Sequence, residues 1–110
     1  MLFRSIVDLP NANILQSMFL KSQNINCNLC SCFELDKLSS YDLVISNYCL
    51  AELSLQNRKE YLNKIDVNCN KEFYIWNSDS LEGLNLDIYN IEIERPQTNK
   101  RGYNKFIYSK

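Results

Sequence analysis

The sequence predicts an α/β fold whose sheet is mostly parallel and ends in a C-terminal antiparallel hairpin. Segments with strand and helix patterns alternate along the 110 residues, and this alternation favours a parallel sheet. The run Leu43–Ile45 is continuously apolar, as a strand buried on both faces of a parallel sheet requires. The last two predicted strands are joined by a loop that contains Pro96 and Gly102, which indicates a hairpin. We expect a single domain over residues 1–110.

Six short segments, rich in β-branched and aromatic residues, are predicted to be strands. They are Phe3–Val7, Ile25–Cys32, Leu43–Ile45, Phe73–Trp76, Ile88–Ile93 and Tyr103–Tyr108. Only a polar loop or a short helix, Glu34–Ser40, separates the second strand from the third. Leu35 and Leu38 are expected to attach this loop to the core.

Two helices complete the predicted order β-α-β-β-α-β-β-β. The first follows the turn at Pro10, which suits a first helical position, and it ends near Gln23. Its apolar positions recur at i, i+1, i+4 and i+5 and form one face: Ile14, Leu15, Met18 and Phe19. The second helix is expected to begin after Ser54, a preferred N-cap residue, and to end near Ile65. Its buried face is predicted to include Tyr61, Leu62 and Ile65.

Composition and charge exclude several classes of protein. The formal net charge is −1, so bulk charge does not favour nucleic-acid binding. No segment approaches the roughly 18 apolar residues of a membrane span, and the N-terminal segment lacks the long apolar region of a signal peptide. We therefore expect a cytoplasmic protein that binds neither nucleic acid nor a membrane. The densest basic patch, Lys100-Arg101, is interpreted as part of a solvated loop.

Five cysteines raise the question of a metal site or disulfides: Cys27, Cys30, Cys32, Cys49 and Cys69. The odd count and the absence of a signal peptide argue against a disulfide framework. Zinc is the alternative, but on a strand Cys27 points away from the face that Cys30 and Cys32 share, and the chain has no histidine. We expect buried structural thiols and no metal, with a zinc site as the open alternative.

Polar residues at the ends of the predicted strands form the candidate site, because open α/β sheets bind ligands outside the carboxyl ends of their strands. Asp8 ends the first strand, where a carboxylate can accept hydrogen bonds from both hydroxyls of a ribose. Capping of the following turn or helix is an equally good interpretation of Asp8. Ser46, Asn47 and Tyr48 follow the third strand, and the Asn47 amide can hold a small polar ligand. A simple strand-ending turn is the alternative there.

Glu52 is expected near the same opening, although a single glutamate is usually a solvated helix residue. Trp76 and Asn77 close the fourth strand. Tyr48 and Trp76 are expected to wall a shared pocket, with a core or rim position as the alternative. Without histidine the chain cannot form a Ser/His/Asp or Cys/His arrangement, and neither of its two glycines follows an apolar strand into a helix.

Four segments resemble the later part of a family of sugar O-methyltransferases, which are class I methyltransferases that use S-adenosylmethionine (SAM). The segments are IVDLP, YDLVISNYCLAELSLQNRKEYLNKI, EFYIWN and IERPQTNKRGYNKFIYSK. The most specific pieces are D-L-P after the first strand and I-S-N-Y-x-x-x-E-L after the third. The resemblance covers nearly the whole chain.

The resemblance implies SAM as the cofactor and a seven-stranded, Rossmann-like sheet with an antiparallel last strand. An acidic residue that ends the second strand of that sheet holds the cofactor's ribose, and Asp8 takes this place here. Cys32 and Phe33 are then expected near the adenine. Ser46 and Asn47, which face the methyl-transfer site, complete the predicted cofactor contacts.

The acceptor implied by the resemblance is a sugar or glycan hydroxyl. Tyr48, Trp76 and Asn77 are the predicted substrate-binding residues. Glu52 matches a glutamate of the third-strand motif, and it is the candidate for orienting the acceptor or receiving its proton. Methyl transfer requires an in-line arrangement of hydroxyl and methyl group.

The family's first strand and its Gly-rich loop have no counterpart in this chain. In the family that strand lies between the strands predicted at Phe3–Val7 and Leu43–Ile45, so its loss leaves two strand edges unpaired. Each buried backbone N–H or C=O group left without a hydrogen bond costs roughly 1–3 kcal/mol of stability. We therefore expect a partial methyltransferase domain, a truncated or split product with little activity alone. The alternative is a non-catalytic module that completes its sheet with a partner chain.

Overall fold

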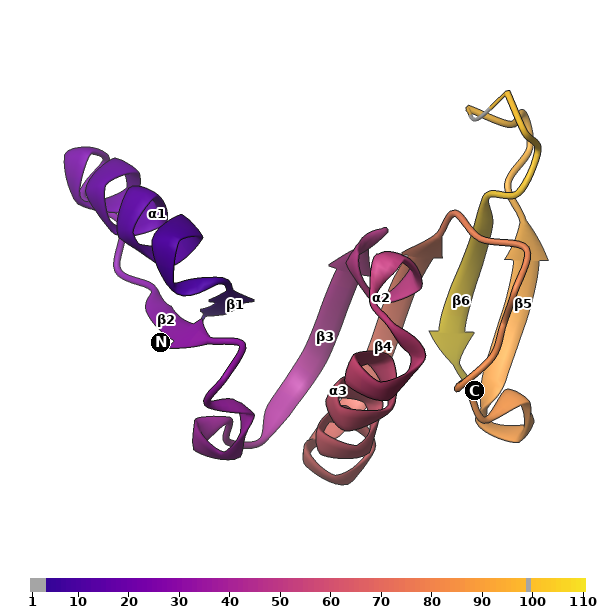
Figure 1. Ribbon diagram of the computed structural model, residues 1–110, viewed down its shortest axis with the longest axis horizontal. Helices are drawn as coiled ribbons and strands as arrows, with labels where there is room; N and C mark the ends of the chain where they lie inside the picture. The colour runs from indigo at the N-terminus through magenta and orange to yellow at the C-terminus, as the bar shows by residue number, and fades with distance from the viewer. Residues whose placement is uncertain (1–3, 99) are drawn as a thin grey trace. The chain divides into compact units, whose positions relative to one another are not determined.

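The computed structural model describes residues 4–98 and 100–110. These residues form two compact units, Met1–Ser39 and Ser40–Lys110, which we call the N-terminal and the C-terminal unit. Each unit contains a pair of parallel strands, and the chain between the two strands of each pair is helical (Figure 1). The prediction of a single domain stays a prediction. Among the described helices, none has the length and apolar character needed to span a membrane.

The N-terminal unit is a two-stranded parallel sheet with one α-helix. Its elements are β1 (Ser5–Asp8), α1 (Pro10–Ser22), β2 (Asn28–Ser31) and a 3₁₀ helix, η1 (Leu35–Lys37). β1 and β2 pair so that Asp8 lies opposite Ser31. The predicted start of the helix is confirmed at Pro10, whose fixed φ suits a first helical residue.

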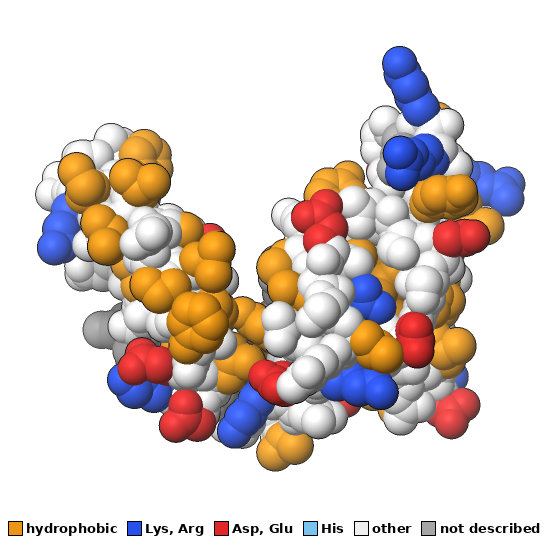
Figure 2. Space-filling view, in the orientation of Figure 1, with side chains coloured by type: hydrophobic (Ala, Val, Ile, Leu, Met, Phe, Trp, Pro, Cys, Tyr) orange, Lys and Arg blue, Asp and Glu red, His pale blue; other side chains and the backbone are white. Residues whose placement is uncertain are grey.

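The apolar face predicted for α1 is not buried. Its four apolar residues are all exposed, and the helix has no buried residue: Ile14, Leu15, Met18 and Phe19. Figure 2 shows hydrophobic side chains gathered over this helix. The physical reason is the size of the unit, because two short strands offer too little surface to cover a complete helix face.

The C-terminal unit is a four-stranded sheet covered by two helices. Its elements are β3 (Tyr41–Asn47), α2 (Cys49–Glu52), α3 (Leu55–Asn68), β4 (Cys69–Trp76), the 3₁₀ helix η2 (Leu86–Ile88), β5 (Tyr89–Ile93) and β6 (Lys105–Ser109). The strand order is β3-β4-β6-β5. β3 and β4 are parallel, whereas β6 is antiparallel to both of its neighbours. Three strands therefore run in one direction, and the predicted α/β class with a C-terminal antiparallel hairpin is confirmed.

The core of this unit lies between the helices and one face of the sheet. Its buried hydrophobic residues are Leu50, Ala51, Leu62, Ile65, Tyr74, Trp76, Tyr89 and Ile107. The predicted face of α3 is confirmed, with Leu62 and Ile65 buried and Tyr61 packed against the core. Ser54 caps this helix as predicted, because its side chain accepts a hydrogen bond from the Asn57 amide at 3.3 Å.

The prediction that Leu43–Ile45 is buried on both faces is wrong for this chain. Val44 packs against the core, but Leu43 is 53% and Ile45 60% exposed. β3 is an edge strand of its sheet, and successive side chains of a strand point to opposite faces. The helices cover the Val44 face, so the opposite face of β3 is left to solvent.

Candidate functional site

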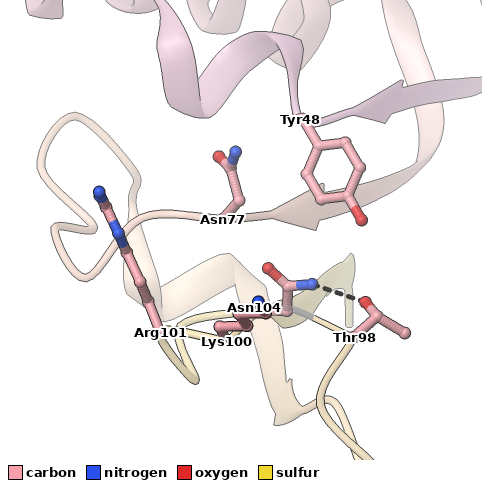
Figure 3. Close-up of a pocket in the computed structure, with 6 residues that line it drawn as sticks. All are labelled: Tyr48, Asn77, Thr98, Lys100, Arg101 and Asn104. Carbon is pink, nitrogen blue, oxygen red and sulfur yellow. Dashed lines mark hydrogen bonds between the residues drawn. The ribbon is translucent and has the colours of Figure 1, made fainter.

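The C-terminal unit has a polar hollow at the edge where β3 and β4 end. Its volume is about 410 Å³, and six described residues line it: Tyr48, Asn77, Thr98, Lys100, Arg101 and Asn104. Tyr48 follows β3, Asn77 follows β4, and the other four belong to the loop between β5 and β6 (Figure 3). Two residues predicted from the sequence, Tyr48 and Asn77, thus share a site at the edge where ligands are expected.

Tyr48 has an unusual backbone conformation at this edge. Its φ is 67°, a left-handed value that costs an L-residue about 1–2 kcal/mol. Hydrogen bonds fix it there, since the Tyr48 amide donates to the Ile75 carbonyl at 2.8 Å and the Ala51 amide donates to the Tyr48 carbonyl at 3.0 Å. A bulky residue held in this way is typical of functional sites. The turn directs the start of α2 and sets the position of the tyrosine ring.

Ser46 and Asn47 do not line the hollow among the described residues. The Ser46 hydroxyl accepts a hydrogen bond from the Leu50 amide at 3.3 Å and so stabilises the start of α2. Asn47 is exposed at the end of β3, opposite Ile75 of β4. Their predicted roles in cofactor binding stay predictions.

Glu52 and Asn77 meet although 25 residues separate them. The Asn77 amide nitrogen donates a hydrogen bond to a Glu52 carboxylate oxygen at 3.1 Å. Glu52 is exposed and ends α2, whereas Asn77 is half-buried. A solvent-accessible carboxylate is thereby oriented beside the hollow, where it can receive a proton from a bound molecule.

Arg58 supports this region from inside the protein, a role that the sequence did not reveal. The side chain is only 7% exposed, and its guanidinium lies 4.9 Å from the centre of the Trp76 ring. It donates hydrogen bonds of 2.7–3.3 Å to four backbone carbonyls, those of Leu50, Ala51, Leu53 and Glu82. The fork of donors thus joins α2 to the segment that follows β4.

Trp76 does not wall the hollow, contrary to the prediction that it forms a pocket with Tyr48. Its side chain is 0% exposed, and its indole nitrogen donates to the Ser80 carbonyl at 2.9 Å. The alternation of side chains along β4 sends Tyr74 and Trp76 to the helix-covered face. Trp76 is therefore a core residue on which Arg58 packs.

The loop between β5 and β6 is closed by a compact hydrogen-bond network. Glu94 oxygens accept from the Thr98 amide at 2.8 Å and from the Asn104 side-chain nitrogen at 2.9 Å. The Gln97 side-chain nitrogen donates to the carbonyls of Glu94 and Asn104 at 2.7 and 2.9 Å. The Thr98 amide and then the Asn104 amide group hold the pKa of Glu94 below its usual value. The network fixes the base of the loop whose tip carries Lys100 and Arg101.

A second cluster of titratable groups lies in the core, away from the hollow's lining. Glu72 is buried, and one of its oxygens accepts from the hydroxyls of Tyr74 and Tyr89 at 2.6 and 2.8 Å. Burial, followed by hydrogen bonding to Glu72, raises the pKa of both tyrosines. Burial and the Glu72 charge likewise raise the pKa of Asp66. We read this cluster as structural, because it joins α3, β4 and β5.

The N-terminal unit brings its three candidate residues together at the carboxyl ends of β1 and β2. The Asp8 carboxylate is half-buried and accepts hydrogen bonds from the Leu9 amide and the Gln16 side chain, each at 2.8 Å. The Cys32 amide donates to the Asp8 carbonyl at 2.9 Å. Phe33 is 78% exposed. A half-buried carboxylate at the end of β1 suits a ribose, and an accessible aromatic ring at the end of β2 suits an adenine, so the chemistry of these residues fits the cofactor implied by the resemblance.

All five cysteines are free thiols. Within residues 4–98 and 100–110, no group of three or more Cys, Asp or Glu side chains is placed to hold a metal ion.

Comparison with known proteins finds a structural likeness. No protein-family profile matches the chain, and no curated protein matches it. The chain is similar to a solved structure described as "PigF with SAH", with a TM-score of 0.65 and 13% sequence identity. The match covers 97% of this chain and 42% of that one, so the chain spans less than half the length of that protein. At this identity the likeness shows the fold, a mixed α/β fold with a mostly parallel sheet and antiparallel strands.

Proposed function

We propose that this chain is part of a SAM-dependent O-methyltransferase. One observation carries the proposal: almost the whole chain, 97% of it, matches the fold of a methyltransferase structure that contains SAH. SAH is the product that SAM leaves after giving up its methyl group. The reversed β6 strand, placed between β4 and β5, agrees with this fold.

Three residues of the N-terminal unit are the proposed cofactor contacts. Asp8 accepts hydrogen bonds from the ribose hydroxyls, and Cys32 and Phe33 contact the adenine. When bound, SAM supplies an electrophilic methyl group on a sulfonium centre. Asp8 is suited to its role because each of its oxygens has one hydrogen bond within the chain, and a carboxylate oxygen can accept more than one.

The hollow of the C-terminal unit is the proposed acceptor site. A sugar hydroxyl offers both a donor and an acceptor, and the lining of phenol, hydroxyl and amide groups matches this chemistry. Glu52, oriented by Asn77, receives the proton that the hydroxyl loses. The volume of about 410 Å³ lies within the range of small-molecule sites.

The chain alone is proposed to have little activity. Neither of its glycines, Gly83 and Gly102, lies in a turn from a parallel strand into a helix. These 110 residues therefore lack the Gly-rich loop that approaches the methionine part of SAM in the family that the sequence resembles. We expect weak cofactor binding, with a dissociation constant on the order of 1 mM.

A SAM titration followed by amide chemical shifts tests the cofactor assignment. We expect shifts at Asp8, Cys32 and Phe33 that are lost in Asp8→Asn. They should persist in Asp36→Asn, which removes an exposed carboxylate from the same unit. Shifts that spare β1 and β2 contradict the assignment. Tight binding in a calorimetric titration contradicts the proposal that the chain is weak alone.

A second candidate function is a non-catalytic module whose sheet is completed by a partner chain, in the simplest case a second copy. The exposed Leu43 and Ile45 on an edge strand favour it, since such edges pair readily with other chains. Size-exclusion chromatography should then show a stable oligomer without cofactor, and Ile45→Lys should dissociate it. Val67→Lys, at a position 83% exposed on α3, is the matched control. A monomer, or an aggregated chain, contradicts this function.

A further inference from the structure

The hollow at the end of β3 and β4 is unevenly charged. Two of its six described lining residues, Lys100 and Arg101, are cations, and none of the six is acidic. Both cations are exposed and come from the loop between β5 and β6. Figure 3 shows them on the loop side of the hollow, with Asn77 and Tyr48 on the strand side.

Two carboxylates near the hollow, Glu94 and Glu52, accept hydrogen bonds from residues of its lining. Glu94 binds the amide and hydroxyl of Thr98 and the side chain of Asn104, and it does not line the hollow. Glu52 accepts a hydrogen bond from Asn77 on the opposite wall. Glu94 thus belongs to the framework, Glu52 is oriented for the acceptor's proton, and Lys100 and Arg101 are the charged residues of the lining itself.

The base of the cationic loop is rigidly built. Asn104 is only 2% exposed, and its backbone amide donates to the Gln97 side-chain oxygen at 3.0 Å. Gln97 and Glu94 together bond both sides of the loop. The fixed base holds two neighbouring cations at the hollow, and the planar guanidinium of arginine suits carboxylate and phosphate groups.

We propose that Lys100 and Arg101 bind an anionic group, a carboxylate or a phosphate, on the acceptor molecule. The acceptor is then an acidic or phosphorylated sugar, whose hydroxyl-bearing part lies against Tyr48 and Asn77. This inference rests on the proposed acceptor site and names its substrate class. It replaces the interpretation of Lys100-Arg101 as a solvated loop with a role in binding.

Titration with three sugars, without SAM, tests the proposal. Glucose 6-phosphate, glucuronate and glucose are added to the ¹⁵N-labelled full chain, and amide shifts are followed at Tyr48, Asn77 and Asn104. We expect at least one of the two anionic sugars to bind about tenfold more tightly than glucose. Whichever binds more tightly shows whether the site prefers a phosphate or a carboxylate. Binding should weaken between about 50 mM and about 200 mM salt, because the contact is exposed.

Matched double variants separate this site from a general charge effect. Lys100→Gln with Arg101→Gln should remove the preference for the anionic sugar. Lys59→Gln with Lys64→Gln removes the same charge from exposed positions of α3, and this double variant should keep the preference for the anionic sugar. Equal binding of all three sugars, or an unchanged preference in the first variant, overturns the proposal. Since no cofactor is present, a failed SAM titration leaves this result unaffected, and the two proposals fail separately.

Discussion

Replacement of Arg58 should clearly destabilise the C-terminal unit. In Arg58→Met the apolar stem is kept and the guanidinium is lost. The carbonyls of Leu50 and Ala51, which it binds in the interior, then lose a donor at about 1–3 kcal/mol each. Loss of the contact with Trp76 adds about 0.5–2 kcal/mol. Removal of the buried charge offsets part of these losses, so we expect the free energy of unfolding to fall by about 3 kcal/mol.

The chain supplies its own probe for this experiment. Trp76 is its one tryptophan, and the Arg58 guanidinium lies over its ring. Urea unfolding followed by tryptophan fluorescence therefore reports the stability of the unit that contains both residues. The emission of the folded protein should also change in Arg58→Met, since the cation beside the ring is gone.

Two control variants define how the result is read. Arg58→Lys keeps the charge but loses the planar fork, so it should fall between the wild type and Arg58→Met. Lys59→Met removes an exposed cation from the next position and should change stability by less than about 0.5 kcal/mol. A loss below about 1 kcal/mol in Arg58→Met would refute the reasoning, because unsatisfied buried carbonyls cost more than that.

Three further predictions concern other parts of the C-terminal unit. In urea unfolding, Gly83→Ala should destabilise the protein more than Gly102→Ala does. Both glycines have positive φ, but a Cβ at Gly83 would lie 3.2 Å from the Leu55 side chain, whereas a Cβ at Gly102 would have no neighbour within 4 Å. Equal losses of stability in the two variants would contradict this argument from crowding. Tyr89→Phe removes a hydrogen-bond donor to the buried Glu72 side chain and should lower the free energy of unfolding by about 1.5–3 kcal/mol in the same assay. A neutral result would contradict a stabilising role for this hydrogen bond. The pKa of Glu94 is lowered in the folded chain, so its contribution to the loop is complete above the ordinary value of 4.5 and is lost as pH falls through the lower folded value. The Thr98 amide shift should therefore titrate with a midpoint below 4.5, and a midpoint above it would exclude the hydrogen bond.

The fold was predictable because its signals are local. Aromatic and β-branched runs marked the strands, and the position of Ser54 marked the start of α3. The starts of β3 and β4 were not predictable from apolar runs. β3 begins at Tyr41 and β4 at Cys69, and these residues pair with each other. Such backbone pairing extends a strand through polar residues, which local composition does not reveal.

The candidate site was predictable only where it follows the strands directly. Tyr48 and Asn77 could be named because each comes immediately after a strand. The role of Arg58 depends on contacts such as that with Glu82, 24 residues away, and nothing local separates it from the exposed cations of α3. Lys100 and Arg101 were visible only as a basic pair in a loop. Trp76 was misplaced because the sequence does not say which face of β4 the helices cover.

The network at the base of the β5–β6 loop has a consequence for how this protein can change. The side chains of Glu94, Gln97 and Asn104 close the base of the loop, on both sides of the segment that carries Lys100 and Arg101. The base that fixes the hairpin and the tip that carries the positive charge are therefore built from different residues. For an engineer, positions 100 and 101 are the natural place to build a library of acceptor preferences on a constant scaffold.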